Sequence, residues 1–323
     1  MSNRRDCIGR RISAWKACHS RGDYLPSMEN PSKTVLVTGA TSGIGLAVTK
    51  ELATSGFAVI ATARTQEKAE QLLGIMSEVG LTARVVVCDF EKSDEIAEAM
   101  VKVFEIWPSG PWAVVNNAGF ALPGSIEDVT GAIAQKQLLI NVLAPAEVIR
   151  ALLPSMRARG SGRIVNISSF SGRVATPFLG WYSASKFALE AISDSLRVEV
   201  REFGIEVVLI EPSGFASSIW ANALPMLPVD ALTGPYRRAY SKARKLINSN
   251  FPEPTPVAKI VRMALESQKP KARYPVGKGT RAIPLLRVLP SNLLDLLMQI
   301  NLGLSKPVTI LRMVIRRFKR TRG

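Results

Sequence analysis

Tyr182 and Lys186 are the residues whose types and spacing most directly suggest chemistry. They stand four positions apart at the start of a stretch, 182–203, whose apolar residues recur with helical periodicity. Their side chains therefore share one face of a predicted helix. A free tyrosine titrates near pH ~10, and a neighbouring ammonium lowers that pKa, which makes the phenol a usable acid or base. A Tyr–Lys pair at this spacing is common and usually structural, so its meaning depends on the residues that accompany it.

A glycine-rich segment precedes the first amphipathic stretch. Residues 38–45 read Thr-Gly-Ala-Thr-Ser-Gly-Ile-Gly and join an apolar strand-like run to a helix-like run. Glycines allow a backbone to approach a pyrophosphate closely, and a helix N-terminus favours its negative charge. The segment is therefore predicted to bind a dinucleotide through Gly39, Thr41, Ser42, Gly43, Ile44 and Gly45. The alternative is a tight strand-to-helix turn that holds no ligand.

The end of the second predicted strand indicates which dinucleotide would bind. An acidic residue there binds the ribose 2′-hydroxyl of NAD, whereas arginine accommodates the 2′-phosphate of NADP. Here the strand ends Ala-Thr-Ala-Arg at 61–64, with no acid. Arg64 can pair with a phosphate in a bidentate manner, and Ser42 can add a hydroxyl. The predicted cofactor is NADP(H), and the alternative is that Arg64 is a solvated strand-end charge.

The composition excludes several classes of function. The single histidine, His19, lies in the first segment, which excludes a Ser-His-Asp hydrolase or a His-rich metal site in the rest of the chain, and no metal is expected. The net charge of +16 belongs to the ends of the chain, because 13 basic residues and one acid follow Gln268 and the segment 1–30 carries +3. The remaining body, 31–268, carries only +1, which argues against a nucleic-acid-binding fold.

Strand-like and helix-like stretches alternate over the middle of the chain. Short β-branched runs buried on both faces are expected at 34–38, 57–62, 84–88, 112–116, 163–168 and 206–211. Amphipathic helices are expected at 44–55, 66–79, 94–106, 135–156 and 182–203, with a later helix at 256–266 and a strand at 272–276. Such alternation predicts an α/β fold: a doubly wound (Rossmann), mostly seven-stranded parallel sheet with helices on both faces. Ligands then bind beyond the carboxyl ends of the strands.

Together these motifs resemble the short-chain dehydrogenase/reductase superfamily over about residues 33–268. The resemblance rests on the TGxxxGIG segment, on Asn-Asn-Ala-Gly at 116–119, on Asn141, and on the pair Tyr182 and Lys186 in a YxxxK motif. It also selects Ser169, which precedes Tyr182 by 13 positions, over Ser168.

The resemblance implies a role for each matching residue. Tyr182 would exchange a proton with the substrate oxygen, Ser169 would orient that oxygen, Lys186 would lower the tyrosine pKa and hold the nicotinamide ribose, and Asn141 would hold a water of a proton relay. Asp89 is implied to contact the adenine, and Asn116, with its neighbours Ala118 and Gly119, is implied to support the sheet beside the cofactor as part of the cofactor-binding site. The run Glu-Pro-Ser-Gly-Phe-Ala-Ser at 211–217 departs from the family's Pro-Gly step and later threonine. Pro212 and Ser217 are the expected nicotinamide contacts there.

The substrate is inferred from similarity to the hydroxysteroid and retinol dehydrogenase branch. Segment 213–255 is predicted to form a helical lid whose apolar residues suit a bulky steroid-, retinoid- or lipid-like alcohol or ketone: Phe215, Ile219, Trp220, Leu224, Met226 and Leu227. The alternative is that these residues pack the lid onto the body. Two rival functions remain at this point, a 3-oxoacyl-thioester reductase and a catalytically silent dinucleotide-binding protein.

The ends of the chain complete the predicted organisation. Residues 1–30 form a basic leader without a secretory signal, either disordered or untranslated if translation starts at Met28. The oxidoreductase domain spans 31–279, and 280–323 is a helical extension. Helices are expected at 292–302 and at 311–318, the second basic and amphipathic, and 291–323 either contacts a membrane surface peripherally or docks on protein. The predicted location is the cytoplasm, with a homo-oligomer left open.

Overall fold

The computed structural model describes residues 34–217, 219, 226, 233–247 and 251–302, which belong to the unit that spans Ser32–Gly323. The predicted leader 1–30, the second tail helix at 311–318 and the lid residues Trp220, Leu224 and Leu227 lie outside the described residues.

Seven parallel strands form one sheet in the order β3-β2-β1-β4-β5-β6-β7. The strands are β1 Thr34–Val37, β2 Ala58–Ala63, β3 Arg84–Val87, β4 Ala113–Asn116, β5 Gly162–Ile167, β6 Ile205–Pro212 and β7 Arg273–Val276. The predicted doubly wound fold is confirmed. Because the chain moves outward from β1 in one direction and from β4 in the other, the carboxyl ends of these two neighbours border the crevice where such sheets bind ligands.

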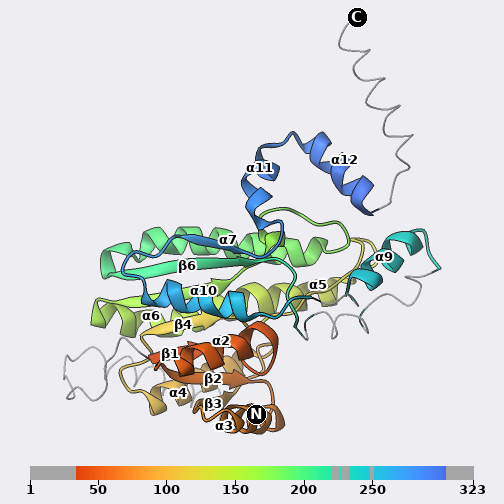
Figure 1. Ribbon diagram of the computed structural model, residues 1–323. Helices are drawn as coiled ribbons and strands as arrows, with labels where there is room; N and C mark the ends of the chain where they lie inside the picture. Colours follow the sequence, from red (N-terminus) through yellow and green to blue (C-terminus); the bar gives the residue numbers. More distant parts are fainter. Residues whose placement is uncertain (1–33, 218, 220–225, 227–232, 248–250, 303–323) are drawn as a thin grey trace, which may run out of the picture. The chain divides into compact units, whose positions relative to one another are not determined.

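Helices cover both faces of the sheet, as Figure 1 shows. One face packs on α2 (Gly43–Thr54), α3 (Gln66–Glu78) and α10 (Thr255–Glu266), and the other packs on α4 (Ser93–Ile106), α6 (Ala144–Arg159) and α7 (Gly180–Glu199). The strands alternate between the two layers. Val35 and Val37 belong to the first hydrophobic core and Leu36 to the second, and all three are fully buried. This alternation explains the uninterrupted apolar runs of the sequence.

One predicted helix is longer and less regular than expected. The stretch anticipated at 135–156 begins as α5 (Gly131–Leu138), passes through a π-helical turn at Leu139–Leu143 and continues as α6. It is also the one described helix with the length and composition to span a membrane, but half of that apolar window is buried inside the protein. Its apolar character therefore fits a helix that packs against the core.

The segments predicted as a lid, 213–255, and as an extension, 280–323, follow β6, with α10 and β7 between their described helices. The lid contains α9 (Arg237–Ile247), and the extension contains α11 (Ile283–Val288) and α12 (Ser291–Leu302). The helix α12 coincides with the one expected at 292–302. The boundaries drawn at 31, 213, 255 and 280 stay predictions.

Candidate active site

The glycine-rich segment forms a compact turn between β1 and α2. Gly39 and Gly43 have φ values of +64° and +53°, which L side chains rarely adopt. At Gly45 the limit is space, because an added Cβ would lie only 2.9 Å from the carbonyl carbon of Gly39 and closer still to its oxygen and to Asn117 Nδ2. These three glycines therefore leave the backbone at the N-terminus of α2 without covering side chains, as a pyrophosphate site requires.

Two residues that the sequence analysis did not single out hold this turn in place. Asn117 Nδ2 donates to the carbonyl oxygens of Thr38 and Gly39, at 3.0 and 2.9 Å. The hydroxyl of Thr38 accepts from the backbone N–H groups of Asn117 and Ala118, each at 3.0 Å. These bonds tie the end of β1 to the end of β4. The Asn-Asn-Ala-Gly motif contains Asn117, but the roles expected from the motif fall on Asn116, Ala118 and Gly119.

Asn116 lies inside the protein and not in the crevice. Its Nδ2 donates to Asn166 Oδ1 at 2.8 Å, and Asn166 Nδ2 donates to Ser193 Oγ at 2.8 Å. The three side chains link β4, β5 and α7, and all three residues are buried. The Asn116 side chain thus supports the sheet beside the crevice, which leaves the backbone for any contact with a cofactor.

At the end of β2, Arg64 and Asp89 lie together. Arg64 Nε is 3.9 Å from Asp89 Oδ1, and the arginine side chain is 64% exposed. An exposed ion pair of this length contributes little stability, so the guanidinium is free to turn toward an added phosphate. The Asp89 carboxylate also accepts from the backbone N–H of Glu91, at 3.1 Å.

Tyr182, Ser169 and Lys186 meet at the carboxyl end of β5. Tyr182 is in the first turn of α7, where it is only 6% exposed, and its phenol is hydrogen-bonded to Ser169. Ser169 caps a 3-10 turn, Phe170–Gly172, and its hydroxyl also accepts from Ser171 N at 3.1 Å. Lys186 Nζ lies 5.8 Å from the centre of the Tyr182 ring and donates to the Ile167 carbonyl at 2.8 Å.

Burial governs the protonation of both groups. It raises the pKa of the Tyr182 phenol, and the hydrogen bond with Ser169 opposes that rise only in part. Burial also lowers the pKa of Lys186 to about 8, against a smaller opposing effect from Glu190. The sequence-based argument considered the ammonium but not this desolvation. The chain on its own therefore holds a protonated phenol, a proton donor, beside an amine that titrates close to neutrality.

Asn141 connects the crevice to α7 from the π-helical turn. Its Oδ1 accepts from Phe120 N, and its Nδ2 donates to Phe120 O and to Ser185 Oγ, each at 3.0 Å. Gly119 packs against it, since an added Cβ would lie 3.0 Å from Asn141 Oδ1. These side-chain bonds fix the segment after β4 against α7, and the water of a proton relay that the resemblance assigns to Asn141 stays a prediction.

The segment after β6 returns to the glycine-rich turn. Pro212 is the last residue of β6, paired with Val276 of β7. Ser217 lies against the turn, because a Cβ added to Gly43 would be 2.8 Å from Ser217 Oγ. Phe215 is buried in the core formed with α10, which favours the packing alternative for this residue.

Helix α9, in the segment predicted as a lid, docks next to the start of α7. Tyr240 is 2% exposed, accepts from Ser125 N at 2.8 Å and donates to Asp128. Phe178, the residue with φ of +62°, contacts the rings of Tyr236 and Tyr240 edge-on at 5.4 and 5.3 Å between ring centres. These contacts join α9 to Phe178, which lies four residues before Tyr182 in the sequence.

Comparison with known proteins identifies the family to which this chain belongs. The sequence profile of the short chain dehydrogenase family matches residues 33–227. The chain belongs to this family. It is 38% identical over 264 residues to the uncharacterized oxidoreductase YusZ of Bacillus subtilis, covering 80% of this chain and 93% of that one. It is 34% identical over 293 residues to mouse estradiol 17-beta-dehydrogenase 2, covering 84% and 75%.

Solved structures of the family agree with the fold. A short-chain dehydrogenase from Streptomyces avermitilis matches with a TM-score of 0.70 and 30% identity over 84% of this chain and 97% of that one. A metagenomic short-chain oxidoreductase in complex with NADP matches with a TM-score of 0.60 and 27% identity over 76% and 96%. This short-chain dehydrogenase is accordingly an oxidoreductase, and its family implies a small-molecule substrate and a nicotinamide cofactor.

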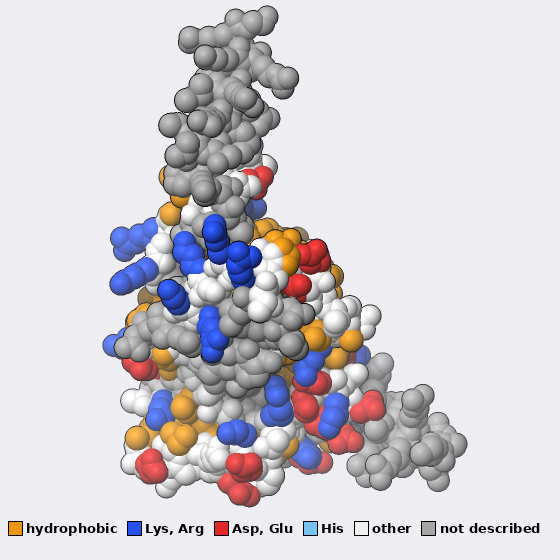
Figure 2. Space-filling view, turned by 90° about the vertical axis from the view of Figure 1, so that its right-hand side faces the viewer, with side chains coloured by type: hydrophobic (Ala, Val, Ile, Leu, Met, Phe, Trp, Pro, Cys, Tyr) orange, Lys and Arg blue, Asp and Glu red, His pale blue; other side chains and the backbone are white. Residues whose placement is uncertain are grey.

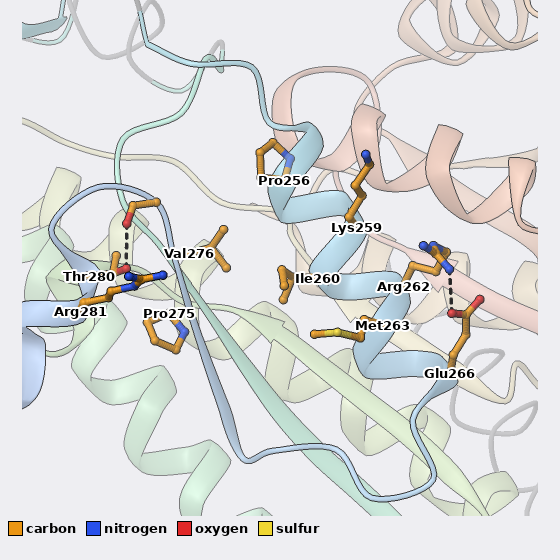
Figure 3. A pocket seen from close by; sticks show the side chains of 11 residues that line it. Pro256, Lys259, Ile260, Arg262, Met263, Glu266, Pro275, Val276, Thr280 and Arg281 are labelled. Carbon is orange, nitrogen blue, oxygen red and sulfur yellow. Dashed lines mark hydrogen bonds and ion pairs between the residues drawn. The ribbon is translucent and has the colours of Figure 1, made fainter.

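A surface groove of this short-chain dehydrogenase lies apart from these residues. A groove of about 570 Å³ runs between α10 and β7 (Figure 3). Its charged lining is partly paired, since Arg262 contacts both Glu51 and Glu266 at 2.8 Å. None of the predicted site residues lines it.

Proposed function

We propose that this short-chain dehydrogenase interconverts a carbonyl group and an alcohol on an apolar substrate, with NADP(H) as cofactor and Tyr182 as the acid/base. The observation that carries the proposal is the buried phenol of Tyr182, hydrogen-bonded to Ser169 and 5.8 Å (ring centre) from the Lys186 ammonium. The bare backbone at Gly39 and Gly45 and the exposed Arg64 fit a dinucleotide.

In this proposal the protein's own side chains transfer the proton. When bound, NADP(H) supplies or accepts the hydride at the substrate carbon. In reduction, Tyr182 donates its phenolic proton to the carbonyl oxygen while Ser169 orients that oxygen. Lys186 then stabilises the phenolate that remains, because an ammonium close to a phenolate favours the charged form.

Substitution of Tyr182 by Phe tests the role of the phenol. Loss of a general acid typically costs about 10²–10⁴-fold in turnover, so Tyr182→Phe should lose activity by this order while NADPH binding is kept. Tyr274→Phe is the matched control, since Tyr274 lies in β7 and its hydroxyl accepts from Lys271 N at 2.9 Å. Retention of turnover by Tyr182→Phe would exclude the proposed acid/base, and an inactive wild-type chain that binds NADPH would favour a catalytically silent protein.

The cofactor preference rests on Arg64. NADP in a structural relative supports a 2′-phosphate site, and the exposed guanidinium at the end of β2 is the group that would bind it. Arg64→Gln should raise the KM for NADPH and leave that for NADH nearly unchanged. Equal Michaelis constants for NADPH and NADH in the wild-type chain would refute the preference.

The substrate class is proposed from the relatives and from the lid. A relative named estradiol 17-beta-dehydrogenase 2 favours a steroid-like ketone or alcohol. A screen of steroid, retinoid, long-chain carbonyl and 3-oxoacyl-thioester substrates, followed through oxidation of NADPH, separates the alternatives. Turnover of the thioester alone would replace the proposed substrate class.

We also propose that the predicted cytoplasmic enzyme contacts an anionic membrane surface peripherally. In the described part of the predicted segment 291–323, Leu293, Leu297 and Ile300 of α12 are exposed. Another described helix, α9, adds exposed cations, because it carries five exposed Lys and Arg and no acid. Figure 2 shows Lys and Arg side chains gathered in the upper half of the face that α9 occupies. Apolar and basic side chains together favour an interface with anionic lipids.

Co-sedimentation with phosphatidylserine vesicles tests this contact. The full chain should pellet with anionic vesicles and not with neutral ones, and removal of 291–323 should weaken pelleting. Equal pelleting of the shortened chain would refute the contribution of the tail. Sedimentation of the same preparations without vesicles reports whether the chain self-associates.

A further inference from the structure

A cluster of buried charges lies one helical turn beyond Lys186. Glu190 of α7 accepts from Arg273 Nε of β7 at 2.9 Å and lies 3.7 Å from Arg173 Nη1. Glu211 of β6 is 3.0 Å from the same Arg173 nitrogen and 3.3 Å from Arg273 Nε. Both carboxylates are almost fully buried, at 5% and 3% exposure. Arg273 also binds Asp194, a more exposed residue one turn further along α7.

This cluster is connected mechanically to the proposed catalytic residues. Arg173 follows the turn that Ser169 caps, and Glu190 stands four residues after Lys186 on the same face of α7. Gly172 packs over both stems, because an added Cβ would lie 3.2 Å from Lys186 Cβ and 3.2 Å from Glu190 Cγ. The serine turn, the lysine and the glutamate are thus in contact.

We propose that Glu190 is a positioning residue for the Tyr182–Lys186 pair: its buried carboxylate, held by Arg273 and Arg173, keeps the Lys186 ammonium charged and in place. The proposal rests on the function proposed above. Arg273 Nε donates a hydrogen bond to Glu190 Oε2, while Glu190 Oε1 is buried with no hydrogen-bond partner among the described residues. The carboxylate therefore acts on Lys186 through its charge, across one turn of helix.

The surroundings of Lys186 contain groups of both signs. Tyr182 and Glu190 share the face of α7 that carries Lys186, the Ile167 carbonyl accepts from Lys186 Nζ, and Arg173 lies on the Glu190 carboxylate after the serine turn. Glu211 of β6 and Arg273 of β7 complete the cluster on the far side of Glu190. Burial lowers the pKa of Lys186 to about 8, and Glu190 is the charged group that opposes this fall. Without that carboxylate, the desolvation that disfavours the ammonium would lose the charge that opposes it.

A purely structural role is the competing explanation. Buried ion networks are weak evidence for stability, since apolar residues of similar volume often replace them without loss. A structural role predicts that the Glu190 variants lose thermal stability and that the pH dependence of turnover does not move. A positioning role predicts that the pH dependence itself moves.

The test compares Glu190→Gln with the wild-type chain in the pH profile of kcat/KM for carbonyl reduction. Loss of a nearby charge typically shifts a pKa by about 1 unit or more, so the alkaline midpoint should move down by about one pH unit. Activity should fall about fivefold at pH 8 and less than about twofold at pH 6. Glu190→Asp keeps the charge and should restore the midpoint. Asp194→Asn is the matched control, because it removes a carboxylate from Arg273 about 12 Å further along α7 than Lys186.

A second readout does not need the substrate. The ¹³Cε resonance of Lys186, assigned with Lys186→Met, follows deprotonation of the amine in the full chain with NADPH bound. Its midpoint should be lower in Glu190→Gln than in wild type. Unchanged midpoints in both measurements, with or without a loss of thermal stability, would overturn the proposal. If neither the wild-type chain nor any variant is active, the proposed function fails. The midpoint of the Lys186 resonance still shows whether Glu190 acts on the lysine.

If Glu190→Gln does not fold, Arg173→Gln answers the same question with the opposite sign. Removing this cation leaves Glu190 bound to Arg273 and should move the Lys186 midpoint upward. A midpoint that stays in place or moves downward would overturn the proposal.

Discussion

Gly45 offers the sharpest test of how the glycine-rich turn binds the dinucleotide. An alanine Cβ there would lie 2.9 Å from the Gly39 carbonyl carbon, whereas ordinary contacts are 3.4–4 Å. The obstructing atoms are the backbone of Gly39 and the amide of Asn117, which itself donates to the Gly39 oxygen. The Gly39 atoms belong to the backbone, and the Asn117 amide is held by its hydrogen bonds to the Thr38 and Gly39 carbonyls, so the turn must open to admit the methyl group.

Overpacking of this kind costs about 1–3 kcal/mol. If most of that energy appears in the complex, where the backbone N–H groups must converge on the phosphates, the NADPH Kd should rise about 5- to 150-fold. Fluorescence titration of Gly45→Ala with NADPH measures this change, and a thermal melt without cofactor reports how much of the cost is paid by the free chain.

Gly74→Ala is the matched control in the same chain. Gly74 lies on α3 with no atom within 4 Å of its added Cβ, so the substitution should leave the Kd unchanged and stabilise the helix by about 0.5–1 kcal/mol. A wild-type NADPH Kd for Gly45→Ala, with Gly74→Ala behaving as expected, would refute the close approach of cofactor and backbone.

Three further outcomes follow from the contacts. Asn116→Ala should lower the free energy of unfolding by about 1–3 kcal/mol, because Asn166 loses a buried partner; an unchanged urea midpoint would contradict this. Tyr240→Phe should loosen the lid, since Ser125 N loses its acceptor, and should raise the KM for bulky substrates more than kcat changes; an effect on kcat alone would contradict it. The folded-state pKa of Lys186, about 8 against 10.5 unperturbed, means that the unfolded chain binds more protons between these values. Wild-type stability relative to Lys186→Met should therefore rise as pH increases from about 8 to 10.5, and a flat difference in urea titrations would refute the burial argument.

The pattern of apolar runs was sufficient to predict the sheet and the placement of its ligand crevice. Strands buried on both faces leave an uninterrupted apolar signal, and strand–helix alternation admits few topologies. The same local reasoning identified Tyr182 and Lys186, because a spacing of four residues in a helix determines that two side chains share a face.

Other features depend on residues that are distant in the sequence. Asn117, not Asn116, reaches the glycine turn, since β1 and β4 are neighbours only in the folded sheet and successive side chains at the end of a strand face opposite sides. The ion cluster around Glu190 joins residues up to 100 positions apart.

By itself, the sequence determined the fold class and the residue types at the site, because both follow from short-range periodicity and motif spacing. Only the tertiary structure decided the protonation of those residues. The pKa values of Tyr182 and Lys186 depend on desolvation, which is the summed effect of every element that covers them and has no signature in the local sequence.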